Sequence, residues 1–169
     1  MFQVASKKVF TVGDSVVYPS HGVGQITGEE TQVIAGVEMK LYVITFAKDK
    51  MILRVPTSRA IKTGLRHLCN SDEFSAVMKS LKGKAKIVKG MWSKRAQEYE
   101  NKINSGDAVA IAEVLRDLYR NIDDPDRSYS ERQIYDAALD RLAQEYSAAA
   151  NINKEEASNL IVDALNQAV

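Results

Sequence analysis

The sequence has very little of the chemistry that most enzymes and metal-binding proteins need. Its 169 residues include one cysteine, Cys69, and two histidines, His21 and His67. One thiol cannot form an internal disulfide or a cysteine-based metal cluster, which favours a reducing compartment. Neither histidine has a metal-binding spacing, and no nucleophile elbow or glycine-rich phosphate loop precedes a helix. The sequence therefore predicts no catalytic residue, no metal and no cofactor, and a protein that is not an enzyme.

Long apolar runs are also missing. No stretch approaches the roughly 18 consecutive apolar residues that a membrane-spanning helix needs. The first residues pass from Lys7 and Lys8 into a β-like segment without the apolar region of a secretion signal. We therefore expect a cytoplasmic protein with no membrane partner.

Positive and negative charges nearly balance over the whole chain, with a net charge of +1, but they are unevenly distributed. Residues 1–60 carry 7 basic and 5 acidic side chains, residues 61–105 carry 10 and 4, and residues 106–169 carry 6 and 13. Cations that lie within about one Debye length of each other attract a polyanion. The middle segment is thus a candidate polyanion-binding region, although lysines that only solvate a linker and a helix face would give the same pattern.

The first third of the chain has the period-two pattern of β-strands. Turn-forming glycine, proline and aspartate residues separate six β-like segments, at residues 9–12, 15–18, 23–26, 31–34, 41–46 and 51–55. Segment 41–46 is almost wholly apolar or β-branched, which places it at the centre of a sheet. About five strands in fewer than 60 residues predict a small β-barrel.

Beyond the β region the apolar spacing changes to three or four, which is typical of helices. Five helices are expected, starting near residues 70, 91, 107, 130 and 153. Asn70 with Glu73 three positions later resembles a capping box at the first start. The expected fold class is α+β with two domains: a β-barrel over residues 1–60, a helical connector and basic linker over residues 61–90, and an all-α helical bundle over residues 91–169.

A basic stretch ends at the only tryptophan of the chain. Residues 82–91 contain two glycines and four lysines before Trp92, and two cations, Lys94 and Arg95, follow it closely. In one interpretation, the ring belongs to the buried stripe of a helix that continues to Ile103. In the other, the first turn of that helix presents the ring to a nucleic-acid backbone or an unstacked base, and the cations hold the phosphates. The spacing alone leaves both interpretations open.

Five segments form an ordered set along the chain: residues 12–24 (VGDSVVYPSHGVG), 54–56 (RVP), 92–95 (WSKR), 106–107 (GD) and 114–118 (VLRDL). Together they resemble the CarD/CdnL family of bacterial transcription regulators. The resemblance implies a SH3/Tudor-like polymerase-interaction domain that docks on the RNA polymerase β subunit, and a helical domain that touches promoter DNA. It also implies a protein of the bacterial cytosol that is nucleoid-associated and a monomer when free. By this resemblance Trp92 would wedge at the upstream fork of the transcription bubble and stabilise the open promoter complex.

The resemblance also assigns polymerase contacts. Arg54 matches a basic residue that the family uses against the polymerase, whereas Gln32 stands where some members have a polymerase-contacting arginine. We expect the barrel to present an exposed strand edge to a strand of the polymerase, with Gln32, Ile34 and Arg54 near that edge.

On the DNA side, Trp92 matches the wedge, and Lys94 and Arg95 match its basic neighbours. Gln97 stands where some members have a DNA-contacting lysine. Two lysines upstream of the tryptophan are candidates to replace that charge: Lys86 and Lys89. The alternative hypothesis is a protein–protein adaptor without direct DNA contact, in which Trp92 is buried and the lysines only solvate a linker.

Overall fold

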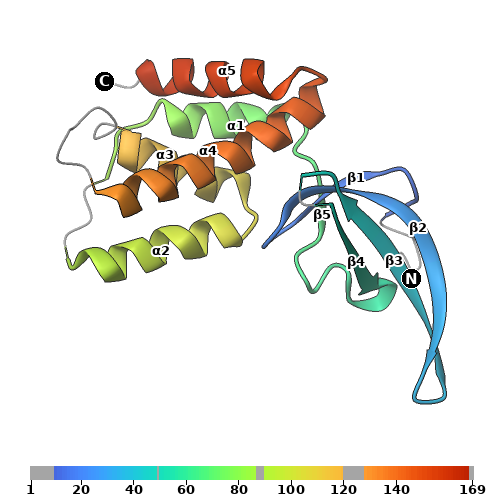
Figure 1. Cartoon of the computed structure of the whole chain (residues 1–169). Coiled ribbons are helices and arrows are strands. Elements are labelled where there is room, and N and C mark those ends of the chain that lie inside the picture. The colour runs from blue at the N-terminus through green and yellow to red at the C-terminus, as the bar shows by residue number, and fades with distance from the viewer. Residues whose placement is uncertain (1–9, 49, 87–89, 120–127, 168–169) are drawn as a thin grey trace, which may run out of the picture. The chain divides into compact units, whose positions relative to one another are not determined.

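A computed structural model describes residues 10–48, 50–86, 90–119 and 128–167 of the chain (Figure 1). Within these residues the chain forms two compact units, each with its own hydrophobic core. The strand unit comprises residues 10–18 and 23–67, and the helical unit comprises residues 19–22 and 68–167. The fold class is therefore α+β, as the sequence predicts.

The strand unit is an antiparallel five-stranded sheet. Its strands are β1 (Ser15–Tyr18), β2 (Gly22–Ile34), β3 (Val37–Phe46), β4 (Met51–Pro56) and β5 (Arg66–His67). They lie in the order β4-β3-β2-β1-β5. β3 pairs with β2 on one side and with β4 on the other, and its residues Leu41, Tyr42, Val43 and Ile44 are all buried. Segment 41–46 thus lies at the centre of the sheet, as predicted.

The sheet is open, so the expected β-barrel is wrong. β4 and β5 stand at the two ends of the strand order, and the two residues of β5 are paired with β1. A barrel closes only when tilt and stagger bring the first and last strands together. The expected first strand also differs, because Thr11 accepts a backbone hydrogen bond from Asp14 in a turn, while Phe10 is buried in the sheet core. Residue 9 lies outside the described residues.

β2 and β3 form one long hairpin, which Figure 1 shows as a curved two-stranded ribbon. Its two-residue turn is Ala35 and Gly36, with φ of 53° and 78°, and two successive positive φ values are typical of a tight type I′ hairpin turn. The predicted segments 23–26 and 31–34 are therefore parts of one strand. β4 pairs only with residues 41–46 of β3, so the outer end of the hairpin extends beyond β4.

The described residues of the helical unit form five helices: α1 (Ser71–Leu81), α2 (Trp92–Asn104), α3 (Ala108–Tyr119), α4 (Tyr129–Ala150) and α5 (Lys154–Asn166). The capping box at α1 is confirmed, because Asn70 accepts from the Glu73 backbone N–H and the Glu73 side chain accepts from the Asn70 N–H. The predicted start of α4 is late. Ser128 is the cap, accepting from the Glu131 N–H at 3.1 Å, and the helix begins at Tyr129.

α4 packs against α2, α3 and α5, and α1 packs against α3 and α5. Phe74, Val77 and Leu81 of α1 are part of the common core, so α1 belongs to the helical unit, whereas the sequence indicated a connector over residues 61–90. In the part of the chain that the structure describes, no helix is long and apolar enough to cross a bilayer. Nor do three or more potential metal ligands gather anywhere in that part.

Candidate functional site

Trp92 is the first residue of α2 and lies half-buried at the edge of the helical core. Its helix begins after Met91, which is extended, with φ of −65° and ψ of 141°, and gives no side-chain cap. The apolar stripe behind the ring continues through half-buried Ala96 to buried Tyr99 and Ile103. The indole therefore takes part in the core and also keeps exposed surface, so each interpretation of the spacing describes part of its position.

Three side chains fix the orientation of the indole ring. The Arg95 guanidinium carbon lies 5.3 Å from the ring centroid, over the ring, in a cation–π arrangement. The Tyr99 ring is 6.2 Å away between centroids, at an interplanar angle of 49°. The indole Nε1–H donates to the Ser130 hydroxyl at 3.4 Å. Because Ser130 belongs to α4, the last contact joins the start of α2 to the start of α4.

The cations after Trp92 have different surroundings. Lys94 is exposed, whereas Arg95 is half-buried, and its Nε atom makes no hydrogen bond within the described residues. Gln97, at the position where some family members have a lysine, donates through Nε2 to Asn101 Oδ1 at 3.0 Å along the same helix. The charge beside the ring thus comes from Lys94 and Arg95.

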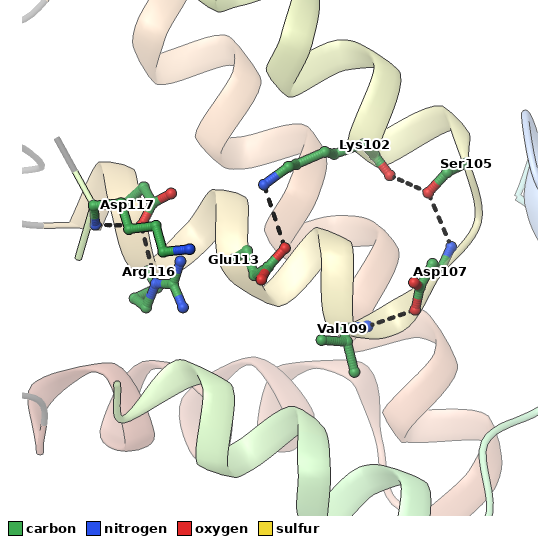
Figure 2. A network of polar contacts seen from close by, with 8 residues as sticks. Lys102, Ser105, Asp107, Val109, Glu113, Arg116 and Asp117 are labelled. Carbon is green, nitrogen blue, oxygen red and sulfur yellow. Dashed lines mark hydrogen bonds and ion pairs between the residues drawn. The ribbon is translucent and has the colours of Figure 1, made fainter. Parts of the chain in front are cut away.

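Lys86 has an exposed side chain, but its backbone is anchored to α3. Its N–H donates to Asp117 Oδ1 at 2.9 Å, and the same oxygen accepts from Arg116 Nε at 2.9 Å. Figure 2 shows Arg116 and Asp117 side by side on α3, and both side chains are at most 10% exposed. Asp117 was not among the site residues predicted from the sequence, although its place three residues after Val114, on the apolar face of the helix, was a usable signal. Lys89 lies outside the described residues.

One cation of the basic segment 61–105, Lys102, forms an ion pair within the helical unit. Lys102 Nζ lies 3.3 Å from Glu113 Oε1, in an ion pair that joins α2 to α3 (Figure 2). Close to it, Asp107 accepts from the Val109 N–H at 3.0 Å, which stabilises the start of α3. The charge of Lys102 is thus partly neutralised within the helical unit.

In the strand unit, Glu30 brings together two of the three predicted polymerase contacts. Arg54 on β4 forms an ion pair with Glu30 on β2, with Nε–Oε1 at 3.0 Å and Nη2–Oε2 at 3.4 Å. Gln32 donates to the same carboxylate at 3.5 Å. Ile34 is exposed two residues further along β2, on the same face because strand side chains alternate. Glu30 was not among the residues predicted from the sequence, although the alternation of positions 30, 32 and 34 places it on that face.

The ion pair changes the pKa of both partners. The hydrogen bond from Arg54 lowers the pKa of Glu30 below its ordinary value of 4.5, and Glu30 raises the pKa of Arg54. A lowered carboxyl pKa stabilises the fold above the unfolded pKa, and this contribution is lost as the pH falls through the folded pKa. Because both groups are exposed, solvent screens the contribution to stability. The main effect of the pair is to hold the guanidinium in one place.

The cavities of the helical unit do not coincide with the predicted site residues. One of about 710 Å³ lies between α1 and the carboxyl end of α4, with Phe74, Met78 and Tyr146 in its wall. A hollow of about 310 Å³ lies between α2 and α4 and includes Ser130. Ser130, which accepts from the Trp92 indole, thus also borders the second hollow.

Two family models match successive parts of the chain. The CarD-like/TRCF RID domain matches residues 10–69, and the CarD C-terminal domain matches residues 76–162, more than half of the chain. "Putative transcription factor YdeB" of Bacillus subtilis (strain 168) is 26% identical over 148 residues, 88% of this chain and 97% of that protein. The solution NMR structure of the 72-residue N-terminal domain of Myxococcus xanthus CarD is 28% identical with a TM-score of 0.31, covering 34% of this chain and 77% of that one. The chain therefore belongs to the CarD family of transcription regulators.

Proposed function

We propose that the chain binds the RNA polymerase β subunit through its strand unit, contacts promoter DNA through its helical unit, and thereby stabilises the open promoter complex. The observation that carries this proposal is the half-buried indole of Trp92 at the first residue of α2, with the Arg95 guanidinium over its ring. A flat ring with exposed surface at a helix start, next to cations, is suited to the upstream edge of a transcription bubble, where bases are unstacked.

The ring and the cations have different tasks. Stacking of one aromatic ring contributes roughly 1–3 kcal/mol per base, and about 1.4 kcal/mol is a factor of ten in an equilibrium. Trp92 alone is therefore able to shift the ratio of open to closed promoter by about one to two decades. Lys94 and Arg95 contact phosphates, which sets the position on the duplex without reading its sequence.

The polymerase contact lies at the β4 edge of the sheet in this proposal. β4 stands at one end of the strand order, and an edge strand presents backbone groups to which a partner strand can add. Arg54 is on this strand, and Glu30 holds its guanidinium next to Gln32. Ile34 adds exposed apolar surface on the face of β2 that carries Glu30 and Gln32. The site thus combines backbone pairing with one cation and one apolar contact.

Neither contact has to be strong by itself. A patch of few cations releases few counterions, so binding to DNA alone is weak and depends strongly on salt. Once the strand unit holds the polymerase, the DNA contact becomes intramolecular, with an effective concentration in the millimolar range. This coupling explains how a chain with a net charge of only +1 can contact DNA in this proposal.

The first prediction separates the two contacts with one variant each. Trp92→Leu keeps apolar bulk against Tyr99 but removes the flat ring, and we expect the open complex to live about tenfold less long with affinity for the polymerase unchanged. Arg54→Gln should weaken affinity for the β subunit. Arg59→Gln, an exposed arginine of the same unit, is its control. Promoter-complex dissociation and β-subunit binding are the two measurements.

An open-complex lifetime that Trp92→Leu leaves unchanged would remove the ring from the mechanism. Equal β-subunit affinities for Arg54→Gln and Arg59→Gln would remove Arg54 from the proposed polymerase contact. Thermal unfolding of each variant shows whether it is folded before either result is interpreted.

The adaptor hypothesis is a second candidate because part of the indole packs on Tyr99 and the helical core. Trp92 is the only tryptophan, so its fluorescence reports on this ring alone. We expect forked promoter DNA, added to the chain alone at low salt, to change the emission of Trp92 and to reduce its quenching by iodide. An adaptor that never touches DNA would give the same emission and quenching with and without the fork.

A further inference from the structure

The start of α4 carries an exposed aromatic side chain that has no role in the core. Tyr129 is the first residue of α4 and is 76% exposed. Among the described residues of the helical unit, only two other large apolar side chains are exposed: Met91 at 75% and Leu160 at 40%. An exposed aromatic ring on a unit that otherwise buries its apolar side chains marks a surface that contacts something else.

Tyr129 and Met91 flank the contact that joins α2 to α4. Trp92 Nε1 lies 3.4 Å from the Ser130 hydroxyl, Met91 precedes Trp92, and Tyr129 precedes Ser130. The two most exposed apolar side chains of the helical unit are therefore each next in sequence to one partner of this hydrogen bond. Chain segments 38 residues apart thus bring a second aromatic residue to the start of α2.

The Tyr129 ring is held along its own helix. Gln133 Nε2 donates to the Tyr129 hydroxyl at 3.0 Å, across one helical turn. This bond restricts the ring at the surface while leaving it exposed. A side chain that is already ordered loses less entropy when a ligand binds to it.

The charges around the two rings select the kind of partner. Lys94 is exposed on α2, Arg95 lies over the Trp92 ring, and Arg132 is exposed on α4, one helical turn from the Tyr129 position. Aromatic rings surrounded by cations are the composition of surfaces that bind unstacked bases along a phosphate backbone. The centre of a protein–protein interface is instead depleted in charged residues. This composition favours a nucleic acid.

We propose that Tyr129 is a second aromatic DNA contact, which packs on a base or sugar next to the one that Trp92 engages, with Arg132 on a nearby phosphate. The inference rests on the proposed function, because it names a further part of the same DNA-contacting surface. Two rings from two helices would hold the melted strand at two successive points. They would therefore oppose reannealing of the two DNA strands more strongly than one ring does.

Photo-cross-linking of the full chain tests this contact directly. We would replace Tyr129 with p-benzoylphenylalanine, irradiate the complex with polymerase and promoter DNA, and make the same replacement at Trp92 and at the exposed control residue Leu160 of α5. We expect DNA cross-links from positions 92 and 129 and none from 160. We also expect Tyr129→Ala to shorten the open-complex lifetime about three- to tenfold, and Tyr129→Phe, which keeps the ring but loses the bond from Gln133, to shorten it less than Tyr129→Ala does.

The outcomes separate this inference from the proposed function. A DNA cross-link from position 92 but not from 129 overturns the role of Tyr129 and leaves the proposed function standing. Cross-links from 129 to a polymerase subunit instead of DNA also overturn it, because the ring then serves a protein contact. If no position cross-links to DNA, the proposed function fails, and this inference fails with it.

Discussion

Trp92 packs on Tyr99 with part of its ring, receives the Arg95 guanidinium over it, and donates to Ser130. A cation–π contact at a partly exposed site contributes about 0.5–1 kcal/mol, which is enough to bias the ring toward one orientation. Arg95 therefore orients the ring, in addition to the phosphate contact that we propose for it. An Arg95→Lys change is not conservative here, because a lysine lacks the planar group that lies over the indole.

The second prediction concerns Asp117, whose carboxylate is almost fully buried. Asp117→Ala leaves the Lys86 N–H and the Arg116 guanidinium without this acceptor, and an unsatisfied buried donor costs about 1–3 kcal/mol. We expect the free energy of unfolding to fall by that amount in urea titrations. Asp163→Ala, which removes an exposed carboxylate from α5, is the control. Equal losses in the two variants would show that the anchor contributes nothing.

At the scale of elements, the β2–β3 hairpin and the edge strand β4 carry exposed apolar side chains. Val33 and Val37 near the hairpin turn and Ile52 on β4 are all exposed, as is Ile34. Exposed apolar side chains on neighbouring strands are expected where a partner binds. An open sheet also keeps its edge strands accessible, which a closed barrel does not. The absence of closure thus suits docking through strand addition.

Two glycines of β2 give the third prediction. A Cβ at Gly24 would lie 2.8 Å from Phe46 Cε1 and 2.9 Å from Ile44 Cγ2, whereas a Cβ at Gly28 would have no atom within 4 Å. Gly24→Ala therefore overpacks the sheet core, and overpacking typically costs about 1–3 kcal/mol. We expect hydrogen exchange of β3 amides to accelerate in Gly24→Ala and to stay near the parent rate in Gly28→Ala. Similar rates in both variants would contradict the packing argument.

At the scale of the whole molecule, the proposed function depends on two units with separate cores. In that proposal neither unit needs to carry a large binding energy, because a polymerase contact would convert the DNA contact into an intramolecular one. The acidic residues are concentrated after residue 105, while the exposed cations Lys86, Lys94 and Arg132 lie before α2, on α2 and at the start of α4. In the proposed function, DNA binding depends on the local positive charge of these cations. The net charge of the whole chain, +1, does not describe that local charge.

The fourth prediction follows from that local charge. If four cations, Lys86, Lys94, Arg95 and Arg132, contact phosphates, the logarithm of the DNA-binding constant should fall with the logarithm of salt concentration at a slope between about −3 and −4. Fluorescence anisotropy with labelled promoter DNA measures this slope. Lys94→Gln should make it shallower by about one unit.

Lys102→Gln is the matched control, because Lys102 already forms an ion pair with Glu113. A slope that changes equally in Lys94→Gln and Lys102→Gln would mean that the whole basic segment acts as a diffuse charge. An unchanged slope in Lys94→Gln would place the phosphate contacts elsewhere.

The sequence by itself determined the local structure and the family. Periodicity and capping residues such as Asn70 and Asn153 set the helices, because these signals act within a few residues. Tertiary structure alone decided whether the sheet closes, where α1 packs, and which side chains surround Trp92. Those outcomes depend on contacts between distant segments, such as Trp92 with Ser130 and Arg54 with Glu30. No local pattern encodes them, because the pairing of distant residues is set by how whole elements pack.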